Sequence, residues 1–159
     1  MPKFNIVETI HSDRIDTVRL GNSGAGNTYG DEEVGKAVKL AATDRFVLCV
    51  AGEPIEGVIS SVNDGTYDGF SIGGIKRRGL KAVTFDGLQA TPGTGTIAAG
   101  DYVVVGTVTV KGTKLPGPLK VTKATDQAAA RTAPFKARVL SLGAAGTGAV
   151  GTTGVVELL

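Results

Sequence analysis

The chain has 159 residues, a formal net charge of +2, 24 glycines and one cysteine. A chain of this length fits one domain with a substantial core. The single cysteine, Cys49, excludes an intrachain disulfide and any zinc site built from several cysteines, and the nearly balanced charge does not favour nucleic-acid binding. No apolar run has the length of a signal peptide or a membrane span, so we expect neither export by such a signal nor membrane insertion.

The first 33 residues predict an extended N-terminal arm and a glycine-rich linker. Residues 3–10 and 14–20 contain short apolar alternations typical of weak strands. They precede GNSGAGNTYGDEE, residues 21–33, in which turn-forming residues follow one another. Such a tail cannot bury its apolar side chains alone, so we expect these to contact a partner or a neighbouring copy. The side chains concerned are Phe4, Ile6, Ile10, Ile15, Val18 and Leu20.

Residues 34–159 predict an all-β body. Short β-branched runs separated by glycine signals recur at intervals of roughly ten residues, which is typical of a sandwich or barrel. The runs are residues 36–42, 45–50, 57–62, 69–75, 80–85, 101–110, 117–123, 135–142 and 153–159. Residues 122–131 are rich in helix formers and predict one short helix that ends before Pro134. The pattern fits a jelly-roll-like β-sandwich, which we favour, or a small β-barrel with extra hairpins.

One glycine motif raises the possibility of a nucleotide cofactor. GTGAVG, residues 146–151, has the spacing of a dinucleotide-binding loop, but only eight residues follow it. A helix, a second strand and a ribose-binding acid cannot fit there. We therefore expect a turn between the last two strands and no cofactor.

The residues that usually carry catalysis are sparse. The only histidine, His11, lies in the predicted arm, and Cys49 lies inside the apolar run FVLCV, where a thiol behaves as a buried hydrophobe. Two near pairs of carboxylates flank turns, at Glu53 with Glu56 and at Asp64 with Asp68. Turn formation explains these pairs better than a calcium site does. We expect no catalytic residues and no metal site.

The clearest charge cluster is Lys76, Arg77 and Arg78, which follow the glycine pair at residues 73–74. The glycines predict that the cluster sits at a hairpin tip. Three adjacent cations on a loop are usually only solvated, and no aromatic residues interleave with them as a nucleic-acid stacking surface would need. If the cluster has a function, contact with another protein is the best candidate.

Several stretches of the body resemble the small capsid decoration, or cement, proteins of tailed bacteriophages. They are GKAVKLAATDRFVLCVAGEPIEGVISSV (35–62), DGFSIGGI (68–75), GTGTIAAGDYVVVGTVTVKGT (93–113) and ARVLSLGAAGTGAVGTTGVVELL (137–159). The resemblance implies a virion structural protein without enzymatic activity, made in the bacterial host cytoplasm. Its partner would be the major capsid protein, on the outer surface of an expanded head, and it would bind there as a dimer or trimer. It implies no membrane or nucleic-acid partner.

Two other classes of function stay open. A carbohydrate-binding or adhesion module on a virion would use exposed aromatic side chains, which are scarce in a chain with three tyrosines and no tryptophan. An enzyme on a β-barrel scaffold would have only unpaired carboxylates for its chemistry.

Overall fold

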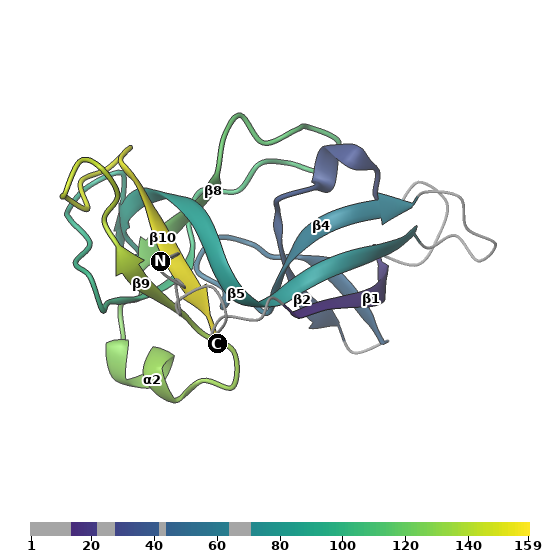
Figure 1. Cartoon of the computed structure of the whole chain (residues 1–159), viewed down its shortest axis with the longest axis horizontal. Coiled ribbons are helices and arrows are strands. Elements are labelled where there is room, and N and C mark those ends of the chain that lie inside the picture. The colour runs from purple at the N-terminus through teal and green to yellow at the C-terminus, as the bar shows by residue number, and fades with distance from the viewer. Residues whose placement is uncertain (1–13, 22–27, 42–43, 64–70) are drawn as a thin grey trace, which may run out of the picture.

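The computed structural model describes residues 14–21, 28–41, 44–63 and 71–159 and is almost entirely β. Figure 1 shows two groups of strands joined by the long strand β5 (Ser71–Leu88), which passes from one group into the other. In each group the strand pairings close on themselves, so each is a small ring of five strands. The predicted all-β class is confirmed, and of the two predicted architectures the small barrel is the one found.

The first ring has the order β1, β3, β2, β4, β5 and returns to β1. Its members besides β5 are β1 (Arg14–Leu20), β2 (Ala37–Ala41), β3 (Arg45–Leu48) and β4 (Gly57–Asn63). The parallel pair Leu20↔Phe46 joins β1 to β3, and antiparallel pairing of β1 with β5 completes the ring. Side chains pointing inward form one core cluster: Leu20, Tyr29, Val38, Phe46, Ile59 and Ile75.

The second ring has the order β5, β10, β9, β7, β8 and returns to β5 through a parallel pairing. Its members besides β5 are β7 (Tyr102–Val105), β8 (Leu119–Lys123), β9 (Ala137–Ser141) and β10 (Thr153–Leu158); the two-residue β6 (Thr91–Pro92) pairs with the end of β5. β-Branched side chains fill this ring around Phe85, which is fully buried. The short helix α2 (Gln127–Thr132) lies outside the strands (Figure 1).

β5 changes rings at Gly79. Residues up to Arg78 pair with β1 and β4, and from Gly79 onward the strand pairs with β10 and then β8. Gly79 has a φ of 108°, which L side chains rarely adopt. A glycine at this point lets one continuous strand turn between two closed rings.

The predicted hairpin at the basic cluster is wrong, because Lys76, Arg77 and Arg78 lie in the middle of β5. Gly73 and Gly74 are strand residues rather than a turn. A Cβ on Gly73 would lie 2.3 Å from the carbonyl oxygen of Ser61 and 2.5 Å from Leu20 Cδ1. The glycines therefore allow the two neighbouring strands to approach β5 closely, which is the other structural use of glycine in a strand.

The described part of the predicted arm and linker is built into the first ring. Residues 14–20 form β1, and Tyr29 packs in the core with its hydroxyl oxygen accepting a hydrogen bond from Leu48 N at 3.0 Å. Asp31–Glu33 form a single 3-10 turn, η1. Residues 1–13 and 22–27 lie outside the described residues, so an arm is left as a prediction for residues 1–13 alone.

The other predicted elements are found with shifted ends. The predicted helix begins later, at Gln127, because residues 122–123 complete β8; the Asp126 carboxylate caps it by accepting a hydrogen bond from Ala129 N at 2.9 Å. GTGAVG connects β9 to β10, as predicted. The predicted strand over 101–110 ends at Val105, where the chain leaves the second ring.

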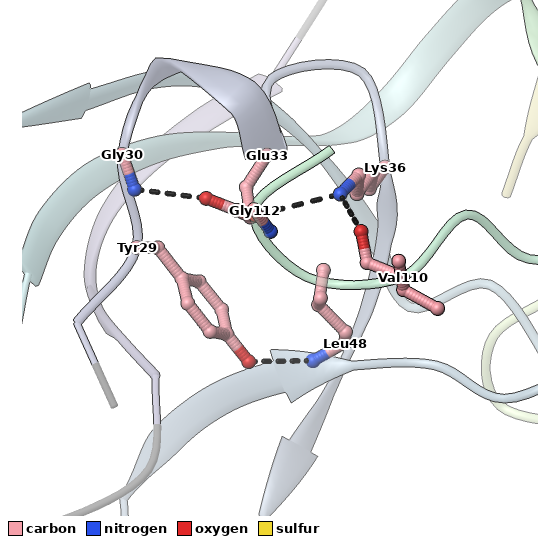
Figure 2. Close-up of polar contacts among 7 residues, drawn as sticks. All are labelled: Tyr29, Gly30, Glu33, Lys36, Leu48, Val110 and Gly112. Atoms are coloured by element: carbon pink, nitrogen blue, oxygen red, sulfur yellow. Dashed lines mark hydrogen bonds and ion pairs between the residues drawn. The ribbon is translucent and has the colours of Figure 1, made fainter. Parts of the chain in front are cut away.

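Residues 106–118, the crossing loop, run from the second ring to η1 on the first ring (Figure 1). Asp86 holds the start of the loop through a hydrogen bond from Thr107 N at 2.9 Å. Its far end meets Glu33 and Lys36, which are almost completely buried (Figure 2). Glu33 accepts hydrogen bonds from Gly112 N and Gly30 N, and the Lys36 ammonium donates to the Val110 carbonyl oxygen at 2.9 Å and lies 3.4 Å from Glu33 Oε1. The loop is thus a second connection between the rings.

Candidate interaction site

The structure separates the predicted contact residues into three groups. Phe4, Ile6 and Ile10 lie outside the described residues. Leu20 is fully buried and Val18 packs against the same core cluster, so in this structure neither is available to another protein. The remaining four, Ile15, Lys76, Arg77 and Arg78, lie along β1 and the first half of β5.

The outward side of β1 and β5 forms a continuous surface, which we call the outer face. Because directly opposed residues of an antiparallel pair point to the same side, the register defines it. Ile15 is opposite Lys76, Thr17 is opposite Gly74, and Arg19 is opposite Ile72. Ile15 is 59% exposed and Ile72 is 47% exposed, and both are among the large hydrophobic side chains that the fold leaves in contact with solvent.

Between the two isoleucines, the outer face carries only small side chains. A Cβ on Gly74 would lie 3.0 Å from the hydroxyl oxygens of Ser60 and Ser61 and 3.2 Å from Ile15 Cγ2. Ser60 donates a hydrogen bond to the Gly74 carbonyl oxygen, and Ser61 accepts one from Gly74 N. These bonds hold the adjacent strands in a fixed relation, so the outer face is rigid.

Sequence reasoning missed Ile72 as a contact candidate, although a signal for it was present. Side chains alternate along a strand, so counting back in twos from the charged Lys76 places Gly74 and Ile72 on the solvent side. The predicted turn at residues 73–74 interrupted that count.

The second feature lies at the waist, where β5 leaves the first ring. Arg14 of β1 is opposite Arg78 of β5, and Arg77 is adjacent. Asp16 neutralises part of this charge, with its carboxylate 3.0 Å from Arg14 Nε and 3.4 Å from an Arg77 nitrogen. The hydrogen bond from Arg14, with help from Arg77, lowers the pKa of Asp16 below its ordinary value, so the carboxylate stays charged near neutral pH.

Arg77 is held between aromatic rings from both halves of the molecule. Its guanidinium carbon lies 4.8 Å from the ring centre of Phe135, in the segment before β9, and 5.7 Å from that of Phe46 in the first ring. Stacking of this kind fixes the plane of a guanidinium while leaving its N–H edges available. A cavity of about 70 Å³ opens at this point, lined by Arg14, Arg77 and Arg78 together with Pro134, Phe135 and Leu159.

The groups considered for catalysis have structural roles where the structure describes them. Burial raises the pKa of the Cys49 thiol to about 12, so it stays protonated. Glu53 pairs with Lys39 and accepts a hydrogen bond from Val50 N, and Glu56 accepts one from Leu40 N. His11, Asp64 and Asp68 lie outside the described residues. Among residues 14–21, 28–41, 44–63 and 71–159, no group of three or more histidine, cysteine or acidic side chains could hold a metal ion.

No family model, curated protein or solved structure matches this chain. Within the described residues, no helix is both long and apolar enough to cross a membrane.

Proposed function

We propose that the chain is a structural virion protein that binds the outer surface of an expanded phage capsid and clamps neighbouring copies of the major capsid protein. The observation that carries this proposal is the outer face, on which Ile15 and Ile72 stand exposed on a hydrogen-bonded sheet. Exposed apolar side chains grouped on a rigid surface are typical of protein contact sites. The partner surface would be apolar opposite the isoleucines.

The double-ring architecture suits a clamp. A protein that holds shell subunits together must keep its contact surfaces at a fixed separation under load. Here the rings share one covalent strand and are joined again by the crossing loop, so relative motion must break the buried contacts of Glu33 and Lys36. This supports a mechanical role and does not call for a catalytic centre.

The predicted arm, residues 1–13, would add further contacts to the same partner. Residues 1–13 lead directly into Arg14 at the start of β1, so Phe4, Ile6 and Ile10 come within reach of whatever the outer face binds. An apolar segment of this kind can add a strand to the open sheet edge of a neighbour. A homo-oligomer, dimer or trimer, would multiply these modest contacts, because after one capsid subunit is engaged the next is met at high effective concentration.

The alternative, a carbohydrate-binding or adhesion module, has less support. Of the aromatic side chains in the described part of the chain, Tyr29, Phe46 and Phe85 are buried, and Tyr102 and Phe135 are half-buried. Each of the five is at least partly buried, which limits the ring surface on which a sugar could stack.

The test is co-sedimentation of the purified protein with expanded heads of its own phage that lack it, counting bound copies per capsid subunit across a titration. We expect saturation at a fixed ratio. The double variant Ile15→Ser with Ile72→Ser should bind at least roughly tenfold more weakly, since two anchoring apolar side chains are lost. Val150→Ser, at a 40% exposed valine between β9 and β10, is the matched control and should bind normally. Folded protein that does not bind these heads would overturn the proposal and make glycan-array binding the next experiment.

A further inference from the structure

The waist cavity carries an arrangement of charge that folding alone does not explain. Arg14 and Arg78 are directly opposed across the β1–β5 pair. Like charges in that position destabilise a sheet. Asp16 contacts Arg14 and Arg77 but makes no ion pair with Arg78, and within the described residues the Arg78 side chain has no hydrogen bond or ion pair. The Arg78 guanidinium therefore has no counter-charge, although it lies beside those of Arg14 and Arg77.

We propose that this cavity is a recognition pocket for an acidic side chain of the protein partner, with Arg78 and Arg14 binding the carboxylate and Arg77 forming its base. This inference rests on the proposed function, because it names the kind of residue that the capsid protein would present beside the outer face. A guanidinium offers two parallel N–H donors that match the two oxygens of a carboxylate.

The lining of the cavity favours a carboxylate. Arg14, Arg77 and Arg78 contribute three guanidinium groups, whose N–H donors match carboxylate oxygens. Pro134 and Phe135 add apolar side chains, against which the methylene groups of an aspartate or glutamate can pack.

The surroundings favour a protein as the source of the anion. Arg14 and the exposed Ile15 are consecutive residues of β1, so the pocket lies beside the outer face, although the two side chains leave the strand on opposite sides. A protein surface can supply an acidic and an apolar side chain together, whereas a nucleic-acid backbone offers phosphates without apolar partners.

The Arg77 side chain is preorganised for binding an anion. Its ring contacts with Phe135 and Phe46 and its ion pair with Asp16 fix the guanidinium before any ligand arrives. A group that is already ordered loses less conformational entropy when it binds.

The first experiment uses the isolated protein and needs no capsid. The guanidinium N–H signals of the arginines are followed by NMR while sodium acetate, sodium phosphate or sodium chloride is added at equal ionic strength. We expect acetate to shift the signals of Arg14 and Arg78 in a saturable way that chloride does not reproduce, and to leave the exposed Arg131 unshifted. Equal responses to acetate and chloride would overturn the pocket. A saturable response to phosphate alone would overturn the acidic side chain as its ligand.

The second experiment compares head binding by two double variants that each remove two positive charges. Arg14→Gln with Arg78→Gln should weaken binding roughly tenfold or more and reduce its dependence on salt. Arg131→Gln with Lys114→Gln, at exposed residues that do not line the cavity, is the control and should bind almost as the unmodified protein does. If both variants bind equally well, the pocket proposal fails and the proposed function stands. If the unmodified protein does not saturate the heads, the proposed function fails and acetate binding alone decides whether the pocket is an anion site. Both variants should melt close to the temperature of the unmodified protein, because all four substituted side chains are exposed, so weaker binding would not reflect unfolding.

Discussion

Glu33→Gln is expected to destabilise the protein by about 3 kcal/mol, the lower end of the range for breaking a buried ion pair. The substitution leaves the Lys36 ammonium buried without a counter-charge, and it turns one acceptor into an NH₂ group among backbone N–H donors. The lower end applies because Lys36 keeps its hydrogen bond to Val110. At about 2–4 °C per kcal/mol for a chain of this size, the melting temperature should fall by roughly 6–12 °C.

The matched control is Glu32→Gln, which removes the same charge from the exposed neighbouring residue of η1. Thermal and urea unfolding of the two variants isolate the effect of the buried carboxylate. Loss of the contact should also free the crossing loop, so trypsin should cleave after Lys111 and Lys114 faster in Glu33→Gln than in the control. A difference in unfolding free energy below about 0.5 kcal/mol between the variants would refute the reasoning, since that is the ordinary range for surface substitutions.

The pH dependence gives an independent check on the same contact. Burial alone would raise the pKa of Glu33, but the N–H groups of Gly112 and Gly30 and the Lys36 ammonium outweigh it and lower the pKa. A carboxyl whose pKa is lowered by folding contributes stability above its unfolded value, about 4.3, and loses that contribution as the pH falls through the folded value. The stability gap between the unmodified protein and Glu33→Gln should therefore be constant near neutral pH and narrow below about pH 4. A double variant, Glu33→Gln with Lys36→Met, should recover part of the loss because no buried charge is then unpaired.

Three further substitutions or probes test other parts of the structure. Gly79→Ala should cost about 1–3 kcal/mol in urea unfolding because of its positive φ, while Gly117→Ala, an exposed glycine with open space around it, should have little effect. Leu20→Ala should cost about 2–5 kcal/mol and Ile15→Ala under about 0.5; equal losses would contradict the burial assigned to β1. The Cys49 thiol should react with a maleimide at about pH 8 only after denaturation, and fast labelling of the folded protein would contradict its burial.

Local patterns in the sequence predicted the strands well and their partners poorly. The β-branched runs, the turn at residues 146–151 and the short helix before Pro134 depend on neighbouring residues, so the sequence is sufficient to find them. Ring closure depends on pairs such as Val18 with Gly73, which are far apart in the chain and leave no periodic signal. The same limit is why the sequence favoured the sandwich over the small barrel, the other predicted architecture and the one found.

β1 shows why the described part of the arm was misplaced. In residues 14–20, Val18 and Leu20 point inward and Ile15 points outward, so the apolar side chains fall on both sides of the strand. A period-two pattern cannot identify a buried side in such a segment. The waist site was equally hidden, since Phe135 and Arg77 meet only because β5 continues through the residues that resembled a turn.

The shared strand also sets an order for events during synthesis. All five strands of the first ring are available once residue 78 has emerged from the ribosome, whereas the second ring needs β10, which ends at Leu158. At 5–20 residues per second, the roughly 80 residues between these points take about 4–16 s to translate. During that interval the first ring can close and hold the beginning of β5, and the free continuation of that strand then serves as the template on which the later strands assemble.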